Sequence, residues 1–218
     1  MSVLSPAVTA RLRGLYAITP EEADTAALVA KLRAALAGGA RVVQYRNKST
    51  DQALRRAQAG TLLALCREAG ASFIVNDDLE LALAIAADGL HLGRDDGDIA
   101  AARRALGPSS LLGASCYDRL ELAQRALQQG ADHVAFGSVF ASPTKPGAVR
   151  APLALFTEAR RLGVPLVAIG GITVENAPQV IAAGADAIAV ISALFDAPRI
   201  EERAREFATL FNAQVSTS

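Results

Sequence analysis

A short stretch near the start of the chain, VVQYRNKST at residues 42–50, carries an amide and two cations at alternate positions. Because successive side chains of a β-strand point to opposite faces, Gln44, Arg46 and Lys48 share one face if this stretch is a strand. Arginine offers a planar fork that matches phosphate oxygens, and lysine adds a point charge. On a solvated strand these would be ordinary surface residues. Facing an enclosed space, they predict a clamp for an anion such as a diphosphate.

Two aspartates, Asp77 and Asp96, follow two later apolar runs of the chain. If those runs are consecutive strands, the two carboxylates can converge on one point. Mg²⁺ prefers hard oxygen ligands and completes its shell with water and substrate phosphate. Aspartate also favours helix N-caps, and for Asp78 and Asp95 capping is the expected role. The pair of Asp77 and Asp96, beside the cations, predicts a Mg²⁺ site.

Two segments near the C-terminus indicate a second anion site. The segment AIGGIT at 168–173 ends an apolar run in two glycines, and VISALF at 190–195 places a serine after the next run. Glycine lets the backbone approach a ligand closely, and backbone N–H groups can bind phosphate. A plain tight turn is the alternative.

A third cation, Lys145, lies in the Gly- and Pro-bearing segment SPTKPGA beside the hydroxyls of Ser142 and Thr144. This segment is predicted to be either a mobile cover over a site or a solvated surface loop.

The positions of these residues follow from a sequence pattern that recurs along the chain. The pattern is an Ala/Leu-rich helical run, then Gly-Ala or Asp-Gly, then a short apolar run. Each glycine is expected to take a left-handed conformation that ends the helix, and each apolar run to form a buried strand. The predicted strands span residues 14–19, 41–46, 72–77, 89–93, 110–116, 133–138, 165–170 and 187–192. Helical patterns between them include residues 25–38, 79–88, 176–184 and 200–211.

Eight such units predict a single (β/α)8 TIM barrel over residues 1–218, with 1–12 as a lead-in and 213–218 as a frayed tail. A doubly wound open sheet is the alternative, and the absence of an early GxGxxG fingerprint argues against it. In such barrels the active site lies at the C-terminal ends of the strands. The chemically capable residues of this chain gather there, while Gly, Ala, Ser and Pro dominate the opposite ends.

Composition argues against several classes of partner and location. The 22 Lys and Arg residues equal the 22 Asp and Glu residues, so nothing favours nucleic acid or an anionic membrane as partner. No apolar run reaches the roughly 18 residues of a membrane span, and the N-terminus is no secretory signal. Two cysteines, Cys66 and Cys116, form no disulfide framework and are expected to be packing residues in a reduced, cytoplasmic protein.

The rim contains no Ser-His-Asp set and no cysteine with an activating base. His91, alone in a strand, is expected to be a satisfied core residue. Two anion sites, one of them with Mg²⁺, indicate transfer between two phosphorylated small molecules, with diphosphate as the leaving group. Whether the chain forms a homo-oligomer stays open.

Over essentially its whole length, the chain resembles the thiamine phosphate synthase (thiamine-phosphate pyrophosphorylase) family. The matching stretches are GLYAIT, VVQYRNKS, FIVNDD, ADGLHLGRDD, LLGASC, GADHVAFGSVFASPTK, VAIGGIT and GADAIAVISALF. Their order and spacing match together, which makes the resemblance specific. It implies that a hydroxymethylpyrimidine diphosphate is joined to a thiazole phosphate, giving thiamine phosphate and pyrophosphate by a dissociative, Mg²⁺-assisted route.

The resemblance also implies roles for single residues. The pyrimidine diphosphate would be held by Gln44, Arg46, Lys48, Asn76, Ser115 and Lys145. The thiazole phosphate would be held by Ser142, Thr144, Gly171, Ile191 and Ser192. Asp77 and Asp96 would bind Mg²⁺, and Arg46, Lys48, Ser115 and Lys145 would be catalytic.

Two departures from the family pattern remove no charge that this chemistry needs. The family often has threonine at Ser142, and many members have a small residue and histidine at Cys116 and Tyr117. Two alternatives stay open: a thiazole tautomerase, which would not need the diphosphate clamp, and a non-catalytic phosphate-binding or regulatory barrel, which should show a decayed rim.

Overall fold

The computed structural model describes residues 11–94, 96–141 and 150–212. Its strands are β1 (Gly14–Ile18), β2 (Val42–Tyr45), β3 (Ser72–Asn76), β4 (Gly89–Leu92), β5 (Leu111–Tyr117), β6 (His133–Phe136), β7 (Leu166–Ile169) and β8 (Ala187–Val190). Its helices are α2 (Thr25–Ala37), α3 (Gln52–Glu68), α4 (Leu79–Ala84), α5 (Ile99–Leu106), α6 (Leu120–Gln128), α7 (Leu153–Ala159), η1 (Arg160–Leu162), α8 (Ala177–Ala183), α9 (Ser192–Phe195) and α10 (Ile200–Asn212).

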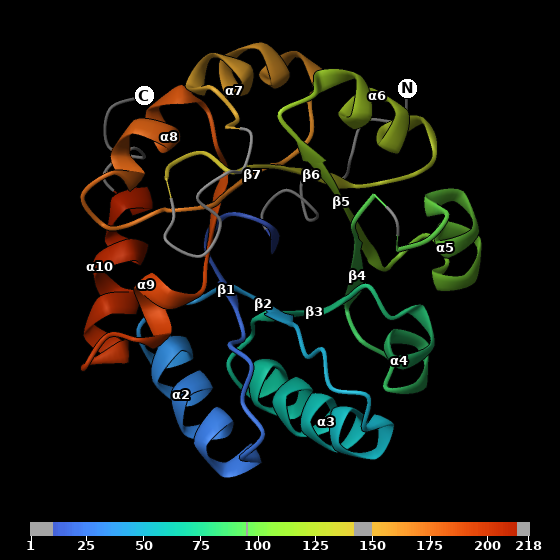
Figure 1. Ribbon diagram of the computed structural model, residues 1–218, viewed down its shortest axis with the longest axis vertical. Helices are drawn as coiled ribbons and strands as arrows, with labels where there is room; N and C mark the ends of the chain where they lie inside the picture. Colours follow the sequence, from blue (N-terminus) through green and yellow to red (C-terminus); the bar gives the residue numbers. More distant parts are fainter. Residues whose placement is uncertain (1–10, 95, 142–149, 213–218) are drawn as a thin grey trace.

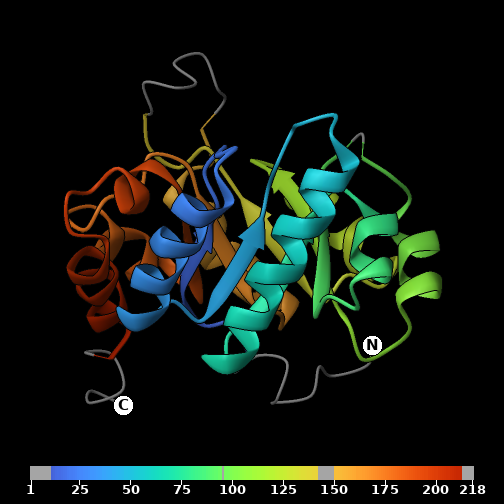
Figure 2. The ribbon, with the colours of Figure 1, turned by 90° about the horizontal axis from the view of Figure 1, so that it is seen from below.

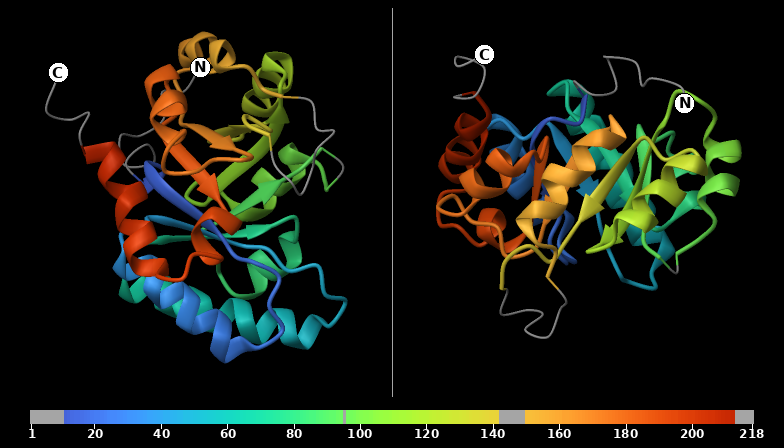
Figure 3. Two further views of the ribbon diagram at one scale, coloured as in Figure 1. Left: turned by 60° about the vertical axis from the view of Figure 1, so that its left-hand side comes forward. Right: turned by 90° about the horizontal axis from the view of Figure 1, so that it is seen from above.

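The strands close into a barrel in chain order, and β1 pairs with β8. Every neighbouring pair is parallel, and the helices form a ring outside the strands (Figures 1 and 3). The predicted barrel is therefore confirmed, and the open-sheet alternative is wrong. In the side view of Figure 2, the arrow of β2 points to the upper face, and the connection to α3 extends beyond it.

Strand alternation divides the core into an inner and an outer shell. Tyr16, Val42 and Ile74 pack inside the barrel, whereas Val43 and Tyr45 pack in the layer beneath the helices. The predicted alternation of β2 is therefore confirmed.

Most of the predicted left-handed glycines are confirmed. Gly39, Gly70 and Gly184, which follow helices, have φ of 105°, 66° and 117°. The pattern with Asp-Gly, at Asp88 and Gly89, behaves differently, because Ala86 (φ 52°) takes the left-handed conformation there. Gly89 instead begins β4, where a Cβ would lie 2.3 Å from the carbonyl oxygen of Leu111. Close strand approach, not helix termination, requires that glycine.

At the end of the barrel opposite the predicted site, Arg103 forms hydrogen bonds and an ion pair with several chain segments. The guanidinium of Arg103 donates to the carbonyl oxygens of Gly130, Gly107 and Ser110 at 2.9, 2.7 and 2.8 Å. It also forms an ion pair with the largely buried Asp132, whose carboxylate accepts the N–H of Leu112, in β5, at 2.8 Å.

Replacing Arg103 by Ala is expected to destabilise the protein by about 3 kcal/mol, because it leaves a largely buried carboxylate and several carbonyls without their donor. Chemical denaturation would measure this loss. Arg104→Ala, which removes an exposed neighbour on the same helix, should change stability by less than about 0.5 kcal/mol. Equal effects of the two variants would contradict this role for Arg103.

Within the described ranges, no helix combines the length and the apolar character needed to cross a bilayer.

Candidate active site

The predicted anion clamp lies at the end of β2. The Gln44 side chain points into the barrel, is 4% exposed, and donates from Nε2 to the Tyr16 hydroxyl at 2.9 Å. Thr19, which follows β1, fixes the next residue: its Oγ1 accepts the N–H of Arg46 at 2.9 Å and donates to the Arg46 carbonyl at 3.2 Å. The chain beyond β2 therefore leaves the barrel in a defined position, with Lys48 exposed.

A carboxylate that sequence reasoning missed bridges this clamp. Oε1 of Glu21 lies 2.9 Å from Nη1 of Arg46, and Oε2 accepts the N–H of Lys48 at 3.1 Å. The adjacency of β1 and β2 could have suggested it, since Glu21 comes shortly after β1. A carboxylate thus uses part of the Arg46 fork that we expect an anionic ligand to use.

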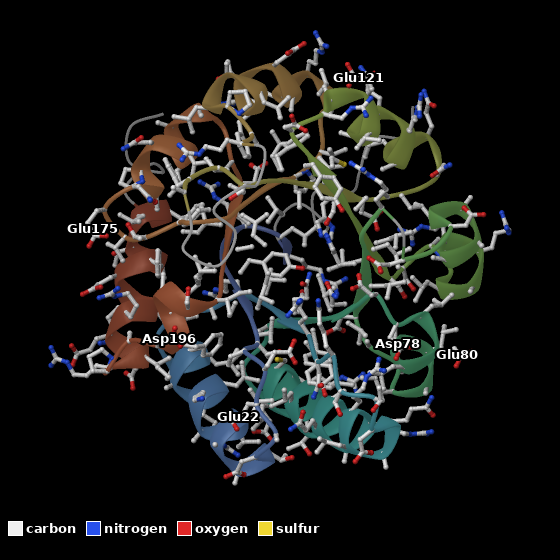
Figure 4. The ribbon with its side chains drawn as sticks, viewed as in Figure 1. Glu22, Asp78, Glu80, Glu121, Glu175 and Asp196 are labelled. Carbon is white, nitrogen blue, oxygen red and sulfur yellow. The ribbon has the colours of Figure 1, made fainter. Side chains whose placement is uncertain are left out.

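A hollow of about 530 Å³ opens beside these residues. It is lined by Arg46, Asn47, Lys48, Arg55, Asn76, Asp77, Asp78, Leu79 and Glu80. Arg55 comes from α3 and pairs with Asp78; sequence reasoning missed it, because a helical arginine ordinarily lies in solvent. Figure 4 shows Asp78 at the start of α4, whereas Glu80, Glu121 and Glu175 lie toward the outer edge of the molecule. Cations from two elements therefore surround one space.

The two predicted metal ligands come together as expected. Asp77 has a left-handed backbone (φ 62°), and its N–H donates to the carbonyl of His91 at 2.9 Å. The carboxylate of Asp96 lies over Gly93, where a Cβ would be 2.2 Å from Oδ2. Burial, together with the nearby charge of Asp96, raises the pKa of Asp77 to about 6. The Asn76 amide donates to the Asp77 carboxylate.

This pair of carboxylates fits Mg²⁺. Among the described residues, no group of three or more His, Cys, Asp or Glu side chains could hold a metal. Mg²⁺ commonly takes one or two carboxylates and leaves its other positions to water and substrate phosphate. Mutual repulsion of the two carboxylates is also relieved by a cation between them.

The expected capping role is confirmed for Asp78, which begins α4 and accepts the N–H of Leu81 at 2.9 Å. Asp95 lies outside the described residues.

Ser115 lies near the end of β5, where the pairing register with β6 shifts. Its Oγ is 2.9 Å from Nε2 of His91 on the adjacent strand β4. The expectation that His91 is a satisfied core residue is only half right, because its Nδ1 finds no hydrogen-bond partner among the described residues. Cys116 and Cys66 are buried and unpaired, as expected for packing residues, and burial raises both thiol pKa values to about 12.

The glycines after β7, which were predicted to form a second anion site, pack closely against the chain segment that follows β6. Gly171 has φ of 64°, and a Cβ there would lie 2.6 Å from the Ala141 carbonyl oxygen and 2.7 Å from that of Phe140. The side chain of Asn176 holds this turn, donating to the Gly171 carbonyl at 2.9 Å and accepting the N–H of Thr173 at 2.8 Å.

Two other residues predicted for this second site follow β8, the strand that pairs with β7. Ile191 follows β8 and packs against the residues inside the barrel. Ser192 begins α9 and is exposed. Ser142, Thr144 and Lys145 lie outside the described residues.

Comparison with known proteins places the chain in a family. The family model described as thiamine monophosphate synthase matches residues 15–194 of the chain. The chain belongs to the thiamine monophosphate synthase family. The thiamine-phosphate synthase of Methylobacillus flagellatus is 59% identical over 201 residues, 92% of this chain and 96% of that one. The thiamine-phosphate synthase of Aromatoleum aromaticum is 60% identical over 204 residues, 93% of this chain and 98% of that one. The chain is thus an enzyme of the thiamine-phosphate synthase type, a transferase of thiamine biosynthesis.

Solved structures agree with this membership. Thiamine phosphate pyrophosphorylase from Pyrococcus furiosus superimposes with a TM-score of 0.83 at 34% identity, covering 94% of this chain and 98% of that one. A 3-hexulose-6-phosphate synthase superimposes with a TM-score of 0.67 at 19% identity, covering 91% of this chain and 99% of that one. That second likeness shows the barrel fold alone.

Proposed function

We propose that this member of the thiamine monophosphate synthase family joins hydroxymethylpyrimidine diphosphate to thiazole phosphate, giving thiamine phosphate and pyrophosphate. The observation that carries the proposal is the hollow of about 530 Å³, whose lining includes Arg46 and Lys48 together with Asp77. A diphosphate with its Mg²⁺ is a ligand that needs both cations and carboxylates at one place.

The cationic side of the hollow would bind the diphosphate oxygens. The Arg46 fork and the Lys48 ammonium would carry most of this contact, and Ser115 would add a hydroxyl at the barrel mouth. Arg46 would have to exchange part of its bond with Glu21 for the ligand. That exchange has a small cost, because both partners of this ion pair are partly exposed to water.

Asp77 and Asp96 would hold Mg²⁺, whose charge would help neutralise the departing pyrophosphate. In the proposed reaction the bond between the pyrimidine methylene carbon and the diphosphate oxygen breaks, and both electrons leave with pyrophosphate. The lone pair of the thiazole nitrogen then forms the new carbon–nitrogen bond. The chain supplies positioned cations and hydrogen-bond donors rather than a nucleophile, which is electrostatic stabilisation of developing charge.

The second substrate would bind on the side of β7 and β8. The turn of Gly170 and Gly171 packs against residues 138–141, and Ser192 lies exposed after β8. Ser142 and Thr144, which follow residues 138–141 in the chain, would complete this site, whereas Lys145 would serve the pyrimidine diphosphate. The thiazole phosphate would therefore lie across the barrel mouth from the diphosphate.

The rim argues against the two alternative functions. A thiazole tautomerase handles only the thiazole and needs no diphosphate clamp, yet Arg46, Lys48, Asp77 and Asp96 are all present. A non-catalytic barrel has no need for two adjacent carboxylates, one of which, Asp77, has its pKa raised to about 6 by burial and by the charge of Asp96. The two buried, unpaired cysteines support the proposal that the enzyme works in the reducing cytoplasm.

A product assay tests the proposal directly. Purified protein would be incubated with both substrates, and thiamine phosphate would be detected through its fluorescent oxidation product. We expect product with Mg²⁺, none with a chelator, and recovery when Mg²⁺ is returned in excess. A folded sample that forms no product with Mg²⁺ would overturn the proposed reaction, and equal product with the chelator would overturn the metal assignment.

A further inference from the structure

Two histidines lie buried in the barrel, one on β4 and one on β6. His91 on β4 is 7% exposed, and His133 on β6 is fully buried. Their ring centroids are 5.8 Å apart. Between them in the sheet lies Gly113 on β5, which pairs with both residues in the register of the barrel. The histidines are therefore two strands apart but neighbours in space.

Gly113 provides the space that brings the rings together. A Cβ at this position would lie 2.3 Å from Nε2 of His133 and 2.5 Å from Nδ1 of His91. Both nitrogens therefore border one small volume, which the side chain of any residue larger than glycine at position 113 would fill. Neither nitrogen has a hydrogen-bond partner within the part of the chain that the structure describes. Apolar side chains would fill this volume without the cost of buried, unpaired polar atoms.

Burial favours the neutral form of both rings. Burial lowers the pKa of His91 to about 4 and that of His133 to about 3. A neutral imidazole carries its proton on one nitrogen and a bare lone pair on the other. The tautomer of His91 therefore decides what its Nε2, 2.9 Å from Oγ of Ser115, can do for that hydroxyl.

The two tautomers have opposite consequences for Ser115. If Ser115 donates its proton to a bare Nε2 of His91, only oxygen lone pairs remain for a ligand. If Nε2–H donates to Oγ, the serine proton is free to point toward the rim. The oxygens of a diphosphate can only accept from such a hydroxyl. Only the second arrangement lets Ser115 donate to them.

We infer that His91 is a positioning residue: as the Nε2–H tautomer it donates to Ser115 and aims the serine hydroxyl proton at the diphosphate. This inference rests on the proposed function. His133 would favour this tautomer of His91, because its polar ring fills the space beside the bare Nδ1 of His91. The aligned N–H and O–H dipoles then point toward the place where negative charge grows as pyrophosphate leaves, which is where preorganised donors act most strongly.

Nitrogen NMR of the ligand-free wild type tests the tautomer without any need for activity. In protein labelled with ¹⁵N in its histidines, Nε2 of His91 should show the signal of a protonated nitrogen, and Nδ1 that of a bare one. The resonances are assigned by loss of the His91 signals in a His91→Gln variant. A protonated Nδ1 would overturn the inference whatever the enzyme does.

Two amide substitutions provide a matched pair for kinetics. The amide of glutamine reaches about as far as Nε2 of histidine, whereas the amide of asparagine reaches only about as far as Nδ1. We expect His91→Asn to lower kcat/KM for the pyrimidine diphosphate about 10- to 100-fold, in line with loss of an aimed donor. His91→Gln should recover most of that loss. Equal losses in the two variants would indicate mere packing and overturn the inference.

A double-mutant cycle separates positioning from general damage. If His91 acts through Ser115, His91→Asn should cost almost nothing further in a Ser115→Ala background. If the two losses in kcat/KM multiply in the double variant, His91 does not act through Ser115. The same four proteins should be titrated with inorganic pyrophosphate and Mg²⁺ by calorimetry, where the same non-additivity is expected. A wild type that forms no product and binds no pyrophosphate would refute the proposed function, whereas an active wild type with multiplying losses would refute only the role of His91.

Discussion

Replacing Asp96 by Asn is expected to lower kcat/KM by about 10²- to 10³-fold, because a metal-held charge at the leaving group contributes several kcal/mol to the transition state. The stabilisation by Mg²⁺ should disappear as well. A ligand that binds only the folded state raises its melting temperature, so millimolar Mg²⁺ should raise that of the wild type and leave that of Asp96→Asn unchanged. Activity assays and thermal melts with and without chelator would measure both effects.

Without Mg²⁺, the melting temperature of Asp96→Asn provides a second test, in which the variant is expected to be no less stable than the wild type. Burial and the charge of Asp96 raise the pKa of Asp77 to about 6, above its ordinary value near 4. The folded state therefore binds the proton more tightly than the unfolded state, and ionisation of Asp77 destabilises the fold as pH rises through about 6. Without metal at about pH 8, Asp96→Asn should melt at or above the wild-type temperature.

That advantage of Asp96→Asn should fade at about pH 4.5, where the protonated Asp77 no longer repels Asp96. Asp118→Asn, which removes a carboxylate from the loop after β5, is the matched control and should keep the Mg²⁺-dependent rise. An Asp96→Asn protein that retained both activity and this rise would show that the metal is held elsewhere.

Replacing Arg46 by Ala is expected to lower kcat/KM for the pyrimidine diphosphate by about 10²- to 10³-fold, because it removes a charged donor from developing negative charge. Arg46→Lys should restore only part of the activity, since lysine keeps the charge but lacks the planar fork. The loss should also appear as weaker binding of inorganic pyrophosphate in calorimetry. Stability should change little, because the pair with Glu21 is solvent-accessible on both sides.

Arg41→Ala is the matched control for this prediction. Arg41 is exposed directly before β2, so it belongs to the same strand segment but to the opposite end of the barrel. Its removal should leave both kinetics and pyrophosphate binding near the wild-type values. If Arg41→Ala and Arg46→Ala reduced activity equally, the assignment of the site to the C-terminal ends of the strands would fail.

Sequence patterns alone predicted the architecture, which the structure confirms, and most of the residues of the proposed site. Helix and strand periodicities are local, so each strand was predicted within a few residues of its observed bounds, as with 72–77 for β3 (Ser72–Asn76). Eight parallel strands in one barrel bring their C-terminal ends to one rim. For that reason the sequence alone predicts that Arg46, Asp77 and Asp96 lie close together.

Only the tertiary structure decided which side chains meet across elements. Glu21 reaches Arg46, and Arg55 of α3 reaches the hollow, because of barrel register and helix placement that no local pattern encodes. The space at Gly113 that joins His91 to His133 depends on three adjacent strands at once, so sequence reasoning treated His91 as an ordinary core residue. Ala86, not Gly89, takes the left-handed turn, because close contact between β4 and β5 needs the glycine elsewhere. Local propensity fixes the elements, while pairing between distant side chains follows from the packing of the closed barrel.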